Sequence, residues 1–318
     1  MDSRDPHYVS GSESDADHSQ RPQKRARRSS SSDRVRTNSK AATSSILPPL
    51  SLSILGVEPL DEFIREIADF IHHLITTRPP DLQGEIEVEA KIGVIKDRGT
   101  GSRLQLPVLV ETILTPKAAD CHFESNMTAM QHKHYNVLLN SLKETSDKPG
   151  YHSSPIAYTH SRLVDSFYTS DREKIRVTRS EKTGEVLASV KKVRLGNLDI
   201  YSPKRAADWR VSVNVEVPMP HPLGSPTHTR RKDRISYSHE EFSIDLTQVA
   251  SSSSPGSQTE LLHELELEIA NSQLLTAAAA KRGVDNSSEP ERSAFDELVR
   301  AFVNNARILV RNAAGGWQ

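Results

Sequence analysis

Strict alternation of apolar and polar residues, repeated along the chain, is the feature that most restricts its fold. Eight segments follow this period of two, and turn-forming residues separate them. Because successive side chains of a strand point to opposite faces, each segment is expected to be a β-strand with one apolar face. The segments are 85–93, 162–169, 173–180, 185–194, 209–217, 229–237, 240–246 and 260–269. So many strands with so few helices predict an antiparallel barrel or sandwich.

Three other stretches have the helical period, and each carries one apolar stripe. The first begins at Leu60 and is closed by Pro79–Pro80, and the third runs from Ser293 to Asn312. The second runs from about Phe123 to Leu142, and its expected apolar side is Phe123, Met127, Met130, Val137 and Leu138. We expect all three helices to pack against the sheet. Segment 271–290 is expected to be a partly ordered linker.

The beginning of the chain differs from the rest in composition. Ser, Arg and Asp dominate it and large apolar residues are nearly absent, so it cannot bury enough surface to offset its conformational entropy. We expect residues 1–45 to be a disordered tail and residues 46–318 to form one domain. A basic run at residues 21–28 is a candidate nuclear-import signal or phosphate-backbone contact, and a solvated charge run is the alternative.

Cysteine usage and hydropathy exclude several classes of protein. Cys121 is the only cysteine, so neither an intramolecular disulfide nor a cysteine-based zinc site is expected. No apolar stretch approaches the roughly 18–20 residues that span a bilayer, and the N-terminus lacks the apolar core of a signal peptide. We therefore expect an intracellular protein without a membrane partner.

Two of the predicted strands carry glutamate at every second position. Glu85, Glu87 and Glu89 share one face of the first strand, and Glu264, Glu266 and Glu268 share one face of the last. Neighbouring carboxylates on a face repel one another by roughly 2.5 kcal/mol at an effective dielectric constant near 20. Closing the sheet into a barrel would make these two strands neighbours. A divalent cation such as Mg²⁺ or Mn²⁺, which prefers oxygen ligands, would then convert the repulsion into a binding site.

Basic residues alternate in the same way on the strands between. The cationic positions that share a face on each strand are Arg230, Lys232 and Arg234; Arg176; and Lys192 with Arg194. A further strand places Glu216 on a polar face opposite a row of valines. A glutamate strand alone is usually a solvated face, and an Arg-x-Lys-x-Arg strand alone is more often a nucleic-acid patch or plain surface. Together they predict a charged interior for a polyphosphate and a divalent ion.

Several segments resemble the fungal mRNA-capping RNA triphosphatases, which belong to the triphosphate tunnel metalloenzyme family. The segments are Glu87–Val–Glu89–Ala–Lys91–Ile–Gly93, Asp165–Ser–Phe–Tyr168, Lys174–Ile–Arg176, Arg230-x-Lys232-x-Arg234, Ile244–Asp245–Leu–Thr247 and Glu264–Leu–Glu266–Leu–Glu268. The similarity runs from about Ile46 to the C-terminus in the family's order. It implies an α+β, mainly β fold: a closed antiparallel β-barrel, the triphosphate tunnel, with packing helices outside.

The resemblance also implies a role for each matched residue. Glu87, Glu89 and Glu268 would be the ligands of Mg²⁺ or Mn²⁺. Glu264 and Glu266 would hold metal-bound or attacking water, and Glu216 would orient the nucleophilic water. Arg176, Lys192, Lys232 and Arg234 would bind the triphosphate and assist catalysis, and Arg230 would bind it as well. The implied reaction is hydrolysis of the γ-phosphate of nascent 5′-triphosphate RNA to a 5′-diphosphate end, the first step of mRNA capping.

The same resemblance implies partners and leaves alternatives open. The expected partners are the 5′-triphosphate end of nascent RNA, the mRNA guanylyltransferase (the capping alpha subunit) and a second copy of the chain, in the nucleus. One alternative is a tunnel phosphohydrolase that acts on inorganic tripolyphosphate, thiamine triphosphate or free nucleoside triphosphates. Another is a non-catalytic scaffold subunit of the capping complex, which the glutamates on both strands argue against.

Overall fold

The computed structural model describes residues 50–59, 61–116, 119–170, 173–252 and 259–316. The predicted tail of residues 1–45, with its basic run, lies outside these ranges. The chain divides into two units, Met1–Glu58 and Pro59–Gln318. Of the first unit, residues 50–58 are described, and they form a short turn in which the Gly56 amide donates to the Ser53 carbonyl.

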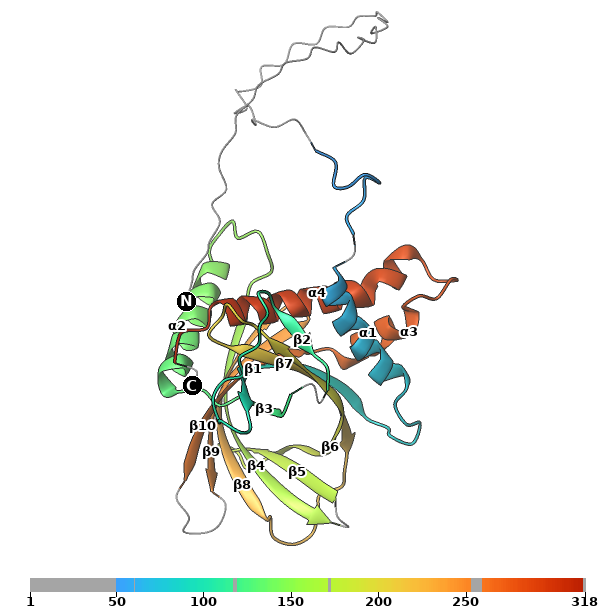
Figure 1. The fold of residues 1–318 in the computed structure, drawn as a ribbon. Helices are drawn as coiled ribbons and strands as arrows, with labels where there is room; N and C mark the ends of the chain where they lie inside the picture. The colour runs from blue at the N-terminus through green and yellow to red at the C-terminus, as the bar shows by residue number, and fades with distance from the viewer. Residues whose placement is uncertain (1–49, 60, 117–118, 171–172, 253–258, 317–318) are drawn as a thin grey trace, which may run out of the picture. The chain divides into compact units, whose positions relative to one another are not determined.

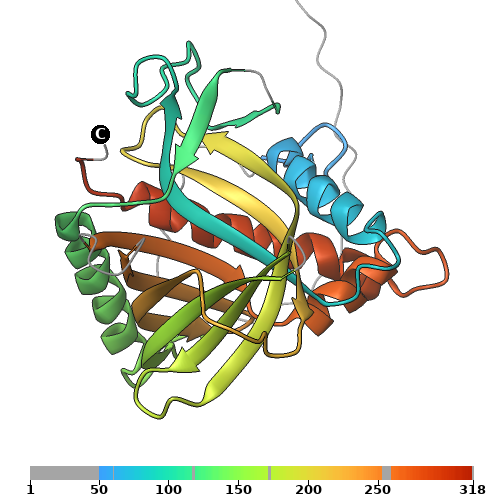
Figure 2. The same ribbon diagram turned by 90° about the horizontal axis from the view of Figure 1, so that it is seen from below.

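Eight antiparallel strands of the second unit close into a barrel (Figures 1 and 2). They follow one another in the order β10-β9-β8-β4-β5-β6-β7-β1, and β1 pairs with β10 to complete the ring. Their bounds are β1 Glu85–Asp97, β4 Ala157–Ser170, β5 Glu173–Ser180, β6 Val186–Tyr201, β7 Asp208–Pro218, β8 His228–His239, β9 Phe242–Ser252 and β10 Glu260–Ile269. The predicted closed barrel is confirmed, and the two glutamate strands are the pair that closes it.

Two short strands extend this sheet, and neither was predicted. Strand β2 (Thr112–Leu114) pairs with β6, and β3 (Cys121–Glu124) pairs with β1. Strand β6 continues to Tyr201, beyond the predicted end at residue 194. Its register shifts between Arg194 and Gly196, which breaks the period of two where the prediction ended. Gly196 also lets α1 approach, since a Cβ there would lie 2.8 Å from Leu74 Cδ1.

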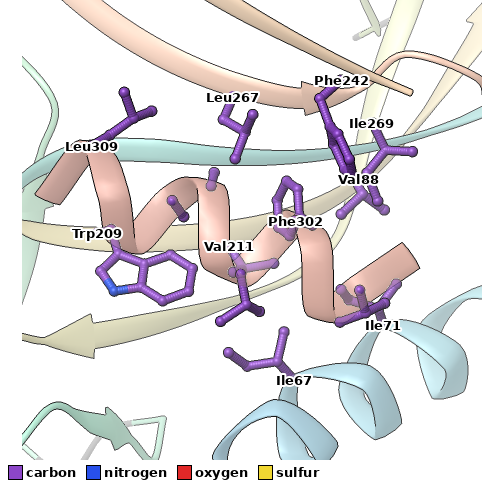
Figure 3. Packing of buried hydrophobic residues seen from close by; sticks show 14 of the residues in the cluster. Ile67, Ile71, Val88, Trp209, Val211, Phe242, Leu267, Ile269, Phe302 and Leu309 are labelled. Atoms are coloured by element: carbon purple, nitrogen blue, oxygen red, sulfur yellow. The ribbon is translucent and has the colours of Figure 1, made fainter. Parts of the chain in front are cut away.

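The hydrophobic core lies outside the barrel, between its wall and the helices. Helices α1 (Glu62–Thr76), α3 (Ser272–Lys281) and α4 (Glu289–Arg311) pack on one another and on the side formed by β1, β7 and β10. Trp209 and Val211 of β7, Phe302 of α4 and Ile67 of α1 are fully buried in this layer (Figure 3). Each such side chain contributes roughly 1.5–3 kcal/mol by leaving water. Apolar residues therefore face the helices, and the polar residues of the same strands face the lumen.

Helix α2 (Ala129–Ser146) packs on β9 and β10, and its predicted start and part of its predicted apolar face were wrong. Met127 is buried and Leu138 packs against the core, as predicted. Phe123 belongs to β3, while Met130 and Val137 are exposed and Tyr135 and Leu139 are buried. The reason is a capping box: the Gln131 amide donates to the Thr128 hydroxyl, and the Thr128 amide donates to the Gln131 side chain. These bonds begin the helix at Ala129 and turn Gln131 inward.

The predicted linker at 271–290 was also wrong, because it contains α3 and the start of α4. Asn271 caps α3 by accepting a hydrogen bond from the Leu274 amide. Leu275, Ala278 and Ala279 are buried along one side, so the alanine run is a packing surface. None of the described helices is both long enough and apolar enough to span a membrane.

Candidate active site inside the barrel

The barrel encloses a cavity of about 500 Å³ whose walls are almost wholly charged. Nineteen residues line it, eight of them basic and seven acidic. Every site residue predicted from the sequence is among them: Glu87, Glu89, Glu216, Glu264, Glu266, Glu268, Arg176, Lys192, Arg230, Lys232 and Arg234. Their neighbours in sequence, such as Val88 and Leu267, are fully buried on the helix side of the wall. The alternation of the strands thus turns these charged side chains inward.

The acidic part of the cavity is formed where β1 meets β10. Glu89 lies directly opposite Glu268, and Lys91 lies opposite Glu266. Glu268 makes no ion pair with a described residue. Burial, followed by the neighbouring carboxylates Glu87 and Asp245, raises the pKa of its carboxyl to about 8. Burial likewise raises the pKa of Glu89.

Two lysines partly neutralise this acidic wall. Lys192 Nζ lies 2.5 Å from Glu87 Oε2 and 3.5 Å from Glu89 Oε1. Lys91 pairs with Glu266, and its Nζ is 3.7 Å from Glu89 Oε2. Burial lowers the pKa of Lys192, but Glu89 and Glu87 outweigh it and hold that pKa above its ordinary value. The side-chain amide of Asn214 donates to both Glu87 (2.9 Å) and Glu89 (3.3 Å), which fixes their orientation.

The carboxylates of β1 and β10 suit a divalent metal ion. Glu87, Glu89 and Glu268 supply oxygen ligands from two paired strands, and oxygen is the donor that Mg²⁺ and Mn²⁺ prefer. Within the described ranges, no three side chains of metal-binding type stand close enough together to hold an ion as they lie. The Lys192 ammonium lies close to both Glu87 and Glu89. Because Glu268 still lacks a positive partner, the donor set fits a divalent cation.

The basic part of the cavity spans β5, β6 and β8. Besides Lys192, three of its cations are paired: Arg234 Nη1 with Asp245 (2.7 Å), Lys232 with Asp165 (2.6 Å) and Arg176 with Glu216 (2.8 Å). Thr247 also accepts a hydrogen bond from Arg234 at 3.1 Å. Lys174, Arg194 and Arg230 have no ion pair with a described carboxylate. The buried Nε atoms of Arg176 and Arg230 have no hydrogen-bond partner among the described residues. These donors suit a ligand with several phosphate oxygens.

Residues 57–314 match the family described as mRNA capping enzyme, beta chain. The chain belongs to the mRNA capping enzyme beta-chain family. It is 37% identical over 285 residues to the mRNA-capping enzyme subunit beta of Schizosaccharomyces pombe, covering 88% of this chain and 89% of that protein. The corresponding subunit of Cryptococcus neoformans is 30% identical over 271 residues, covering 83% of this chain and 65% of that protein.

Solved structures agree with this family assignment. The structure of the S. pombe Pct1 RNA triphosphatase is 37% identical, covers 84% of this chain and 100% of that chain, and has a TM-score of 0.74. The same enzyme in complex with the Spt5 CTD is 36% identical, covers 85% of this chain and 100% of that one, and has a TM-score of 0.76. The capping beta-chain resemblance stated from the sequence motifs is therefore confirmed.

Several lining residues were given no role by the sequence motifs. Asp165 is buried, accepts a hydrogen bond from Thr178 at 2.6 Å and pairs with Lys232. Burial raises the pKa of Asp165, but Lys232 and these hydrogen bonds outweigh it and hold that pKa below its usual range. Lys174 and Phe167 also line the cavity. All three lie at alternate positions of predicted strands, so the alternation predicts that their side chains face the barrel interior. It does not indicate what each residue does.

Proposed function

We propose that this capping beta chain is an mRNA 5′-triphosphatase that hydrolyses the γ-phosphate of nascent 5′-triphosphate RNA in the presence of Mg²⁺ or Mn²⁺. One observation carries the proposal: the glutamates of β1 and β10 lie side by side in a cavity whose other strands supply lysines and arginines. The similarity to a protein named RNA triphosphatase supports the same reaction.

The basic residues would bind and orient the triphosphate. Arg230, Lys232 and Arg234 alternate along the inner face of β8, and Arg176 and Lys192 face the lumen from β5 and β6. A row of fixed cations stabilises the charge that develops on the phosphate oxygens, and it needs no reorganisation during the reaction. Ion pairs such as Arg176 with Glu216 hold these cations in place before substrate binds.

The acidic residues would hold the metal and the attacking water. Glu87, Glu89 and Glu268 are the proposed metal ligands, and a bound divalent ion would neutralise phosphate oxygens and polarise the γ-phosphate. Glu264 and Glu266 would accept hydrogen bonds from water near it. Glu216, 2.8 Å from Arg176, would orient the water that attacks the γ-phosphorus. Cleavage of the bond to the β,γ-bridging oxygen then leaves inorganic phosphate and a 5′-diphosphate end.

Assembly with other capping components is part of the proposal. A guanylyltransferase consumes a 5′-diphosphate end, so it is the enzyme that must act next. The S. pombe relative has been solved in complex with the Spt5 CTD, and we propose a comparable recruitment here. Exposed apolar residues in the first unit, Ile54, Leu55 and Val57, favour contact with a second copy of the chain, which analytical ultracentrifugation would test. Nuclear localisation is proposed from the basic run.

Phosphate release tests the enzymatic proposal. The full chain should release phosphate from triphosphate-ended RNA with Mg²⁺ or Mn²⁺. This release should stop when the metal is chelated. Free nucleoside triphosphate and inorganic tripolyphosphate should be compared in the same assay. Faster release from tripolyphosphate than from RNA would favour the phosphohydrolase alternative. Release from none of the three would leave a scaffold subunit and overturn the proposal.

A further inference from the structure

Phe167 lies at one rim of the cavity and has no part in the chemistry proposed above. Among the described residues that line the cavity, it is the only aromatic one. It lies three residues before the end of β4, Lys174 is the second residue of β5, and His228 is the first residue of β8. The end of β4 therefore lies beside the starts of β5 and β8, and these three residues are neighbours in the sheet. Lys174 is exposed and the two rings are partly exposed, so the cluster is open to solvent.

The aromatic ring of Phe167 is stacked on the imidazole of His228. The ring centroids are 4.3 Å apart and the rings are within 4° of parallel, because the two residues are direct partners in the β4–β8 ladder. Lys174 Nζ lies 4.8 Å from the Phe167 ring centroid, and the guanidinium carbon of Arg230 lies 5.5 Å from it. The cluster thus combines a flat aromatic surface with two cations.

This aromatic pair adjoins the phosphate-binding part of the cavity. Arg230, one of the proposed triphosphate ligands, lines the cavity. His228 lies two residues before it on β8 and therefore on the same side of the strand. Arg176, another of these ligands, is the β5 partner of Phe167. A 5′-terminal nucleoside is joined directly to its α-phosphate, so its base must lie next to the phosphate-binding cations and towards an opening. Phe167 and His228 meet both conditions.

We propose that the Phe167–His228 pair is the platform on which the first base of the RNA stacks, an inference that rests on the proposed function. Lys174 has a long, flexible side chain and no ion pair with a described carboxylate. Phosphate oxygens would draw its ammonium away from the ring and free that face for the base. Stacking involves no hydrogen bonds to base edges, so little preference among the four bases is expected. The platform distinguishes RNA ends from inorganic polyphosphates, which carry no base.

Two substitutions of Phe167 separate stacking from packing. Phe167→Leu keeps the apolar volume but removes the aromatic face, whereas Phe167→Trp keeps an aromatic face. Phosphate release by the full chain would be measured with metal on triphosphate-ended RNA, on the same RNA with an abasic first nucleotide, and on inorganic tripolyphosphate. Phe167→Leu should raise the KM for ordinary RNA about five- to hundredfold, the usual range for losing a stacked base. Phe167→Trp should restore it.

The abasic RNA and tripolyphosphate decide the outcome. Wild type and Phe167→Leu should have the same KM for both, since neither substrate has a base to stack. A KM for ordinary RNA that does not change in Phe167→Leu would overturn the platform, and so would an equal loss on all three substrates. Thermal melting of each variant shows whether the barrel has formed. Wild type that hydrolyses tripolyphosphate but not RNA would instead contradict the proposed function itself.

Discussion

Replacing Glu268 by glutamine should stabilise the metal-free protein and abolish its activity. Glu268 lies opposite Glu89 and has no described ion-pair partner. Its carboxyl has an ordinary pKa of 4.5, which burial and nearby carboxylates raise to about 8. At pH 7 the unfolded chain would hold this group ionised, so folding carries a penalty of roughly 3 kcal/mol at 1.36 kcal/mol per pKa unit. Glutamine has the same shape and carries no such penalty.

The sign of the pH dependence follows from the raised pKa. Between pH 4.5 and about 8 the folded state binds more protons at Glu268 than the unfolded state, so stability falls as the pH rises through this window. Glu268→Gln and wild type should therefore melt together near pH 4.5. At pH 7 the variant should melt roughly 5–10 °C higher, given the usual scaling for a domain of this size.

Thermal unfolding with a chelator, from pH 4.5 to 8.5, measures this effect. Glu260→Gln is the matched control because Glu260 is exposed on the same strand, and its melting temperature should follow wild type throughout. Added Mg²⁺ or Mn²⁺ should raise the melting temperature of wild type more than that of Glu268→Gln, because a ligand stabilises the state that binds it. The reasoning is refuted if Glu268→Gln melts with or below wild type at pH 7, or if it releases phosphate at the wild-type rate.

Three further predictions concern other parts of the chain. Deleting residues 1–45 should leave triphosphatase activity nearly unchanged, because the residues that line the cavity all fall between Glu87 and Glu268. The deletion should also reduce nuclear accumulation. Loss of activity would contradict the first expectation. Phe302→Ala should lower the free energy of unfolding by about 3–5 kcal/mol in denaturant titrations, since Phe302 is fully buried between α4 and the barrel; a loss below about 1 kcal/mol would show that the site collapses freely. Burial and His263 lower the pKa of His132 to about 4 from 6.5, so the unfolded state binds the proton first and stability falls as the pH drops from 6.5 to 4. His132→Asn should remove part of that fall in acid-unfolding curves, and an unchanged slope would show that His132 does not contribute.

The barrel and its charged interior followed from the sequence because both rest on the alternation of strands. Glutamates alternate with apolar residues along β1, and valines alternate with polar residues along β7, which fixes the face that packs and the face that is polar. The glutamates of one strand repel one another, so their face had to be either exposed to water or the site of a bound cation. Pairing of β1 with β10 then brings the glutamates of both strands onto one wall of the barrel, with Glu89 opposite Glu268.

Pairings across the lumen could not be predicted in this way. Lys192 of β6 reaches Glu87 of β1 although β7 lies between them, and which side chains meet depends on the stagger of the strands around the barrel. The Phe167–His228 stack could not be predicted for the same reason. It depends on the register between β4 and β8, which nothing near either residue in sequence sets. The prediction of helix α2 missed a local signal: the capping box of Thr128 and Gln131 begins the helix at Ala129, with Gln131 buried and Met130 exposed.

Phosphate release from triphosphate-ended RNA by wild type and Glu87→Ala is the most direct test of a hydrolytic centre inside the barrel. Wild type should release phosphate with Mg²⁺ or Mn²⁺ and lose this activity when the metal is chelated. Glu87→Ala should be inactive under every condition while its melting curve shows a folded barrel. Metal-independent release by wild type, or full release by a folded Glu87→Ala protein, would contradict the assignment of this cavity as the active site.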